Sequence, residues 1–259
     1  MNLTLMSARS APWILCAAAV FAAGSSRAQP ASAPKLTVAA AANLTDVFEQ
    51  VGRAFTAQSG VPVVFSYGAT AQLAQQIDNG APFDLFAAAD TEHVDALVAS
   101  RKLTADSRAV YALGQLALWI PGSEKSGVRE LKDLTAPAVR FVAVAQPELA
   151  PYGQASIEAL KKARLWDAVQ PKVVYGNTIN QAKQLAASGN ADAAFTAYSL
   201  VLHENGTVVK VDPRLYRPIA QALAIIAGSV RREQAKQFRA FLLGAAGRAI
   251  LASNGYLLP

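Results

Sequence analysis

Two small, uncharged polar residues stand at points where a predicted strand turns into a predicted helix. Asn43 follows the apolar stretch 36–42 and occupies the position expected of a helix N-cap, because apolar residues recur at helical spacing behind it. Thr70 occupies the matching position after the stretch 61–68. N–H groups at a helix start lack partners within the helix, and two such starts aimed at one spot can bind an anion. The pair therefore predicts a site for a small anion.

Two further helix starts are expected in the second half of the chain. Tyr152 lies in the turn QPELAPYG that precedes a predicted helix, and Gly176-Asn177-Thr178 precedes another. We expect Asn177 and Thr178 to cap that second helix, which leaves the N–H of Ile179 as one of the unpaired donors. Uncharged hydroxyl and N–H donors favour a fully ionised oxyanion, since an anion that carries a proton needs an acceptor in the site.

The remaining residues contain no motif for catalysis or for metal binding. The sequence has no G-x-S-x-G elbow, no phosphate loop and no G-x-G-x-x-G fingerprint. Neither His93 nor His203 has a second ligand three or four residues further along the chain, so neither predicts a site for a bare metal cation. Asp84 and Asp90 could do acid–base work as a pair, but we expect Asp90 to cap a helix and Asp84 to bind a neighbouring backbone or basic group. The chain is therefore not expected to be an enzyme.

The elements that would position these residues alternate between strands and helices in two blocks. Three strand-then-helix units up to Ser100 predict a parallel sheet flanked by helices, because parallel strands need crossover connections. An apolar strand at 112–120 is expected to cross into a second block of the same kind, and the apolar stretch 221–227 to return. A last helix over 233–252 would pack on the first block. The predicted fold is therefore α/β with two lobes, each a mixed sheet flanked by helices, joined by two crossing strands.

The start of the chain and its composition favour export. Arg9 precedes a short apolar stretch at 11–23, and the small residues Ser26 and Ala28 follow at the two positions that a signal peptidase reads. The only cysteine, Cys16, lies in this segment, so the mature chain is expected to have no disulfide. The predicted parts are a signal peptide at 1–28, a first lobe at 29–112 plus 222–259, and a second lobe at 113–221.

The charge of the chain gives no sign of a nucleic-acid partner. The 259 residues carry a formal net charge of +6, and the charged fraction is 16%. The basic residues are scattered and are not interleaved with aromatic residues, as they are on a nucleic-acid surface. We expect no nucleic acid among the partners.

Five segments occur along the chain in an order found in one known family: AAAANLTDVF, SYGATAQLAQQI, GAPFDLFAAAD, PELAPYGQASIEAL and the terminal NGYLLP. Together they resemble the periplasmic molybdate-binding proteins of ABC transporters, from about Lys35 to the end of the chain. The resemblance implies a type II periplasmic-binding fold that closes around molybdate or tungstate and delivers it to an inner-membrane ABC permease. It also implies a periplasmic location. We expect a monomer that needs no cofactor beyond the bound oxyanion.

The same resemblance carries four ligand contacts to this chain. The A-A-A-[SN]-L-T motif places one on Asn43, the S-x-x-[ST] turn one on Thr70, the P-x-G turn one on Tyr152, and the helix start in GNTINQA one on the N–H of Ile179. One departure concerns a tyrosine that some relatives have after this helix. Ala197 stands at the matching position here, and Tyr198 is one residue along. We therefore expect Tyr152 to supply the phenol contact.

Three other functions are open at this point. Sulfate, phosphate or another tetrahedral oxyanion would suit similar donors, because the sequence does not show the size of the cavity. An exported enzyme could use Asp84 and Asp90 on a small anionic substrate, although no nucleophile–base pattern supports it. The effector lobe of a transcription factor is disfavoured by the signal peptide and by the lack of a DNA-binding segment.

Overall fold

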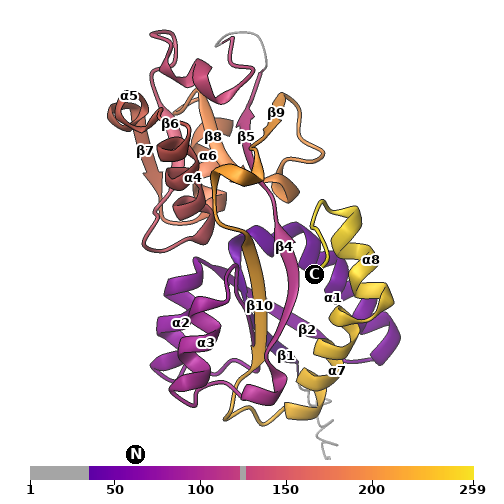
Figure 1. The fold of residues 1–259 in the computed structure, drawn as a ribbon. Helices are drawn as coiled ribbons and strands as arrows, with labels where there is room; N and C mark the ends of the chain where they lie inside the picture. Colours follow the sequence, from indigo (N-terminus) through magenta and orange to yellow (C-terminus); the bar gives the residue numbers. More distant parts are fainter. Residues whose placement is uncertain (1–34, 123–126) are drawn as a thin grey trace, which may run out of the picture. The chain divides into compact units, whose positions relative to one another are not determined.

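The computed structural model describes residues 35–122 and 127–259 (Figure 1). The predicted signal peptide at 1–28 lies outside the described residues. No helix in the described part of the chain combines the length and the apolar character that crossing a membrane requires.

The described residues form two five-stranded sheets with helices packed around them. The strands are β1 (Leu36–Ala41), β2 (Val63–Gly68), β3 (Leu85–Ala87), β4 (Ala109–Gly114), β5 (Leu116–Ile120), β6 (Val142–Ala145), β7 (Val173–Gly176), β8 (Ala193–Ala197), β9 (Thr207–Lys210) and β10 (Ile219–Ile225). The α-helices are α1 (Thr45–Ser59), α2 (Thr70–Asp78), α3 (Glu92–Ala99), α4 (Pro151–Lys162), α5 (Trp166–Val169), α6 (Ile179–Ala187), α7 (Arg232–Leu243) and α8 (Ala245–Ser253). Short 3-10 turns include η1 (Ala42–Leu44) and η5 (Tyr198–Leu200).

The two sheets have the same plan. The first has the order β2-β1-β3-β10-β4, and the second has the order β7-β6-β8-β5-β9. In each sheet four strands point in one direction and one strand is antiparallel to them: β10 lies between β3 and β4, and β5 lies between β8 and β9. This is the predicted pair of lobes, each a mixed sheet flanked by helices. Because parallel strands end at one edge, the helix starts of each lobe gather at that edge.

The chain passes between the lobes at two places. The apolar stretch predicted as one crossing strand is two strands, β4 in the first sheet and β5 in the second, separated only by Gln115. The return occurs before β10, which lies wholly in the first sheet and begins at Ile219, two residues earlier than predicted. The chain therefore leaves the first sheet after Gly114 and re-enters it at Ile219.

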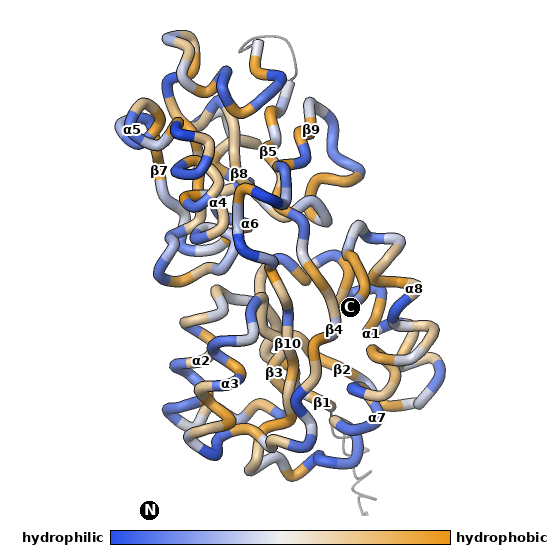
Figure 2. Tube along the Cα trace, viewed as in Figure 1, coloured by the Kyte–Doolittle hydropathy of each residue, from blue (hydrophilic) through white to orange (hydrophobic). Residues whose placement is uncertain are grey.

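The first sheet is buried on both faces, as its sequence requires. The alternation along β1 sends Val38 and Ala40 to the face covered by α1, α7 and α8, and Ala39 to the face covered by α2 and α3. Figure 1 shows these two helix groups on opposite sides of the strands β1 and β10. Phe48 and Phe238 meet edge to face at 6.1 Å in the first of these layers. In Figure 2 the helices α2 and α3 alternate between hydrophobic and hydrophilic stretches, as expected for helices with one buried face.

The prediction of one terminal helix over 233–252 is wrong in one respect. The segment forms two helices, α7 and α8, which are separated at Gly244. The backbone of Gly244 is extended, with ψ of 176°, and an extended residue cannot continue the helical hydrogen bonds. Both helices pack on the first lobe as predicted, because α1 contacts each of them.

Candidate anion-binding site

All four predicted ligand residues line one small cavity between the two lobes. Asn43 and Thr70 come from the first lobe, and Tyr152 and Ile179 come from the second. The rest of the lining consists of small or apolar residues: Ala41, Ala42, Gly68, Ala69, Ala89, Ala150 and Pro151. The cavity has a volume of about 10 Å³, which holds about one water molecule, so its walls must shift to admit a four-oxygen anion.

The Thr70 hydroxyl is held so that its proton stays available. Thr70 is the first residue of α2, and its side chain is 1% exposed. The helix cap is Ala69, so the expected cap role of Thr70 is wrong by one position. The Thr70 Oγ1 accepts the Ala89 N–H at 3.1 Å, and the described residues provide no acceptor for the hydroxyl proton. Thr70 can therefore donate this proton to an anion in the cavity.

The Tyr152 hydroxyl is arranged in the same way. Tyr152 is the second residue of α4 and is 1% exposed. Its oxygen accepts a hydrogen bond from the Gln221 Nε2 at 3.0 Å, and no acceptor for its proton lies among the described residues. A Cβ on Gly114 would collide with this hydroxyl, so only glycine leaves room for the tyrosine beside β4. Since Pro151 has no N–H, the Tyr152 N–H is the first free donor of this helix start.

The side chain of Asn43 does not cap a helix, so this part of the prediction is wrong. Asn43 lies in the 3-10 turn η1, makes no cap hydrogen bond, and is 2% exposed. Its Nδ2 donates at 3.0 Å both to the Gln221 Oε1 and to the Tyr256 hydroxyl, which uses both amide hydrogens. The side-chain amide therefore has no hydrogen left for an anion. The donors that this turn offers to the cavity are the backbone N–H groups at its start, those of Ala42 and Asn43.

The fourth helix start is α6, and it follows the prediction. Thr178 is the N-cap, and its Oγ1 accepts the Gln181 N–H at 3.1 Å. Ile179 is the first helical residue, so its N–H has no partner within the helix. The Asn180 Nδ2 donates to the Thr45 Oγ1 at 3.0 Å and so ties this helix start to the first lobe.

Three residues of the site's support were missed by the sequence reasoning. Gln221, Tyr111 and Tyr256 form a buried polar cluster with Asn43 and Tyr152 directly behind the cavity. Their positions are 69 to 213 residues from their partners along the chain, so no local motif links them. The one available signal was a glutamine in the apolar stretch QALAIIA, because a buried amide requires polar partners.

Burial keeps the phenols of this cluster neutral. It raises the pKa of Tyr152 and of Tyr111 well above their ordinary values, and it raises that of Tyr256 to about 12. All three hydroxyls therefore carry their protons at neutral pH and act as hydrogen-bond donors. No arginine or lysine lines the cavity, so the donors facing an anion are all uncharged.

Of the two tyrosines that could provide a phenol contact, only Tyr152 lines the cavity. Tyr198 does not line the cavity. Its ring lies 4.0 Å from the Lys210 Nζ, and a Cβ on Gly255 would come within 2.8 Å of the ring. Tyr152 is the tyrosine that faces the cavity.

Both carboxylates make structural contacts, but the prediction that Asp90 caps the helix is wrong by one position, because Thr91 is the N-cap of α3. Asp84 is 2% exposed, and its oxygens accept the Thr37 N–H and the Ser229 hydroxyl, each at 2.8 Å. Asp90 accepts the His93 N–H at 3.1 Å in the first turn of α3. Neither carboxylate is left unpartnered, which weakens the reading of the pair as acid–base catalysts.

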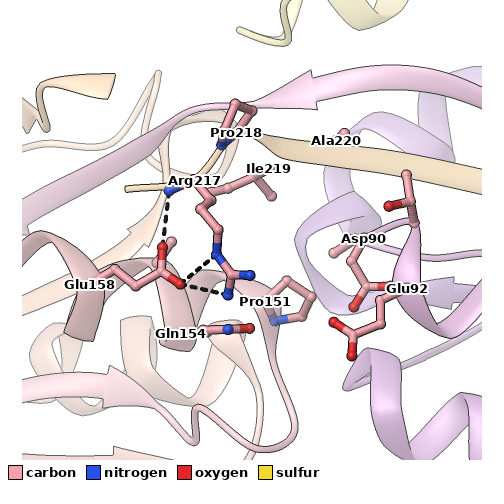
Figure 3. Close-up of a pocket in the computed structure, with 12 residues that line it drawn as sticks. Asp90, Glu92, Pro151, Gln154, Glu158, Arg217, Pro218, Ile219 and Ala220 are labelled. Atoms are coloured by element: carbon pink, nitrogen blue, oxygen red, sulfur yellow. Dashed lines mark hydrogen bonds and ion pairs between the residues drawn. The ribbon is translucent and has the colours of Figure 1, made fainter. Parts of the chain in front are cut away.

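A larger cavity of about 160 Å³ adjoins the site and shares Ala89 and Pro151 with it (Figure 3). Asp90 and Glu92 line one side of this cavity, and Arg217 lines the other. The Arg217 guanidinium is paired with Glu158 at 2.7 Å, so its charge is already compensated. With three carboxylates, those of Asp90, Glu92 and Glu158, and a single arginine in its wall, this larger cavity is a poorer anion site than the small one.

Helix starts from two α/β lobes that converge on a cavity beside the crossing segments define a type II periplasmic-binding fold. The comparisons agree with this class. Residues 36–257 match the family model described as bacterial extracellular solute-binding protein. The molybdate-binding protein ModA of Rhodobacter capsulatus is 34% identical over 231 residues, which are 89% of this chain and 91% of that protein.

Solved structures show the same relationship. The Azotobacter vinelandii periplasmic molybdate-binding protein superposes with a TM-score of 0.83 at 31% identity, covering 87% of this chain and all of that one. The sulfate-binding protein SubI of Mycobacterium tuberculosis has a TM-score of 0.72 at 21% identity, covering 86% of each chain, which is a likeness of fold alone. The chain belongs to the bacterial extracellular solute-binding proteins and, within them, to the family of the ModA proteins.

Proposed function

We propose that this protein is the periplasmic substrate-binding component of an ABC importer and that it binds molybdate in the interlobe cavity. The observation that carries the proposal is the convergence of Asn43, Thr70, Tyr152 and Ile179 on one cavity whose lining contains only uncharged donors. Molybdate is a compact dianion without a proton, so a site that only donates hydrogen bonds matches it. The similarity to ModA proteins over nine-tenths of the chain supports the same ligand.

The four residues divide the contacts by atom. Thr70 and Tyr152 contribute hydroxyl protons, and the turn at Asn43 and the start of α6 at Ile179 contribute backbone N–H groups. Hydrogen bonds to a charged group are each worth about 1.5–3 kcal/mol, so half a dozen support roughly nanomolar to micromolar binding after the cost of association. Tungstate has the same charge and shape and is expected to bind in the same place.

We propose the biological setting from the family and from the sequence together. The protein is exported by the signal peptide at 1–28, acts in the periplasm as a monomer, and delivers the oxyanion to an inner-membrane ABC permease. It needs no cofactor and catalyses no reaction, and the contacts that occupy Asp84 and Asp90 are consistent with a binding role.

A thermal-shift panel tests this function directly. The purified protein is heated with sodium molybdate, tungstate, sulfate, phosphate or chromate at equal concentrations. A ligand present well above its Kd raises the melting temperature by mass action, and we expect the largest shifts with molybdate and tungstate. Stabilisation by sulfate or phosphate without any by molybdate would assign the site to another oxyanion.

A further inference from the structure

Gln221 occupies a position from which it touches both lobes of the site. It lies in β10 of the first sheet, next to an irregularity in the pairing with β4 between Gln221 and Ala222, and it is 0% exposed. Its side chain contacts Tyr152 of the second lobe and Asn43 of the first. We propose that Gln221 is a positioning residue that aims the Tyr152 hydroxyl proton into the anion cavity and thereby sets the selectivity of the site.

The first step is the direction of one hydrogen bond. The Gln221 Nε2 donates to the Tyr152 oxygen at 3.0 Å, and an amide nitrogen can only donate. The hydroxyl must therefore direct its single proton elsewhere. Tyr152 lines the anion cavity, and the described residues offer its proton no other acceptor. A bound oxyanion would provide that acceptor.

A hydrogen bond to its Oε1 prevents the Gln221 amide from rotating by 180°. Its Oε1 accepts from the Asn43 Nδ2 at 3.0 Å, and it lies 3.0 Å from the Tyr111 hydroxyl, whose single proton is shared with the Ala88 carbonyl at 2.9 Å. Asn43 is itself fixed, because the Tyr256 hydroxyl donates to the Asn43 carbonyl at 2.8 Å and accepts from its Nδ2. A reversed amide would place the Gln221 NH₂ group against the Asn43 Nδ2, which can only donate. The cluster therefore has one consistent hydrogen-bond direction, and it ends at the proton of Tyr152.

The fixed direction of the Tyr152 hydroxyl determines which anions the cavity can bind. With Tyr152 held as a donor, the cavity presents no hydroxyl oxygen to a ligand that carries a proton, such as hydrogen phosphate. Thr70 obeys the same rule, since its oxygen is occupied by the Ala89 N–H. This inference rests on the proposed function and adds to it the residue that enforces discrimination against protonated oxyanions.

The test is a double-mutant cycle measured by calorimetry with sodium molybdate and with sodium phosphate near pH 8. Gln221→Met retains the length of the side chain and removes its hydrogen bonds. The matched control is Gln115→Met, because Gln115 lies on the other crossing, outside the cavity lining, and its Nε2 donates to the Gly255 carbonyl at 2.7 Å. Both changes are also made in the Tyr152→Phe background, and the unfolding midpoint of every ligand-free variant is measured.

We expect Gln221→Met to weaken molybdate binding about tenfold to a hundredfold, the range of one hydrogen bond to a charged group. Gln115→Met is expected to change it less than about twofold. In the Tyr152→Phe background the effect of Gln221→Met should largely vanish, because the two changes act through the same proton. The preference for molybdate over phosphate should fall in Gln221→Met, since a released hydroxyl can turn and accept.

Two results would overturn the inference. One is equal molybdate affinity in Gln221→Met and Gln115→Met, and the other is the same loss with and without the Tyr152 hydroxyl. If Gln221→Met does not fold, Gln221→Asn replaces it, because it keeps a buried amide that is one methylene too short to reach Tyr152. Failure of the unmutated protein to bind molybdate would instead contradict the proposed function.

Discussion

The Thr70 Oγ1 accepts the Ala89 N–H at 3.1 Å and so joins the start of α2 to the loop after β3 on one wall of the cavity. Thr70→Val keeps the shape of the side chain but removes the hydroxyl. It should weaken molybdate binding about tenfold or more, because one donor to the anion is lost and the Ala89 N–H loses its partner. Titration calorimetry measures the change. Thr70→Ser keeps the hydroxyl and should bind within a few-fold of the parent, so equal losses in both variants would argue against a donor role.

Asn43→Ala should lower affinity although the Asn43 backbone N–H remains. The change removes both Nδ2 hydrogen bonds and leaves the turn η1 without its anchor to Gln221 and Tyr256. We expect the free energy of unfolding to fall by about 1–3 kcal/mol and molybdate binding to weaken by more than about 1 kcal/mol. Urea unfolding and calorimetry separate the two effects. Asn190→Ala, at an exposed position, serves as the control. Lost stability with unchanged affinity would make Asn43 only a part of the scaffold.

Tyr152 and Tyr198 offer a matched pair of phenylalanine substitutions. Tyr152→Phe removes a hydroxyl from the cavity lining, whereas Tyr198→Phe removes one from a ring that packs under Lys210. Only the first should weaken molybdate binding, by about tenfold or more, because hydrogen bonds to charged groups are worth about 1.5–3 kcal/mol. Parallel calorimetric titrations decide the point. A loss in Tyr198→Phe without one in Tyr152→Phe would reverse the assignment.

His93 should make stability depend on pH. The hydrogen bond from its Nδ1 to the Asp90 carboxylate, at 2.7 Å, raises the pKa of His93 above its ordinary value of 6.5. A raised folded-state pKa stabilises the protein fully below about pH 6.5, and this contribution is lost as the pH rises through the folded-state value. His93→Gln should therefore lower the free energy of unfolding at low pH, by up to about 1 kcal/mol. This difference between the two proteins should shrink as the pH increases. Urea unfolding of both proteins across that range tests this, and a difference that grows with pH would contradict it.

The sequence predicted the elements that local patterns encode. The strand-then-helix rhythm predicted both lobes, and the small residues at the turns near Asn43 and Thr70 marked the edge where the helix starts gather. The placement of Tyr152 and Ile179 in the same cavity followed from the shared plan of the two lobes. These features depend on neighbours along the chain, which is why patterns of a few residues were sufficient.

The polar cluster behind the cavity could not be predicted, because it depends on contacts between distant segments. The sequence around Gln221 predicts an apolar strand. Nothing near it indicates that Asn43, 178 residues away, donates a hydrogen bond to its side chain. The role of Asn43 changed for the same reason: a cap is a local interaction, but tertiary partners hold this amide. The division of the last helix at Gly244 was missed because the helical periodicity on either side is nearly continuous.

Binding of molybdate in this cavity is tested most directly by a calorimetric titration of the mature protein with sodium molybdate, repeated in the presence of sulfate at the same concentration as molybdate. We expect one molybdate per protein, with a Kd in the roughly nanomolar to micromolar range and little competition from sulfate. No heat of binding with molybdate, or full displacement of molybdate by equimolar sulfate, would contradict the assignment of this cavity as a molybdate site.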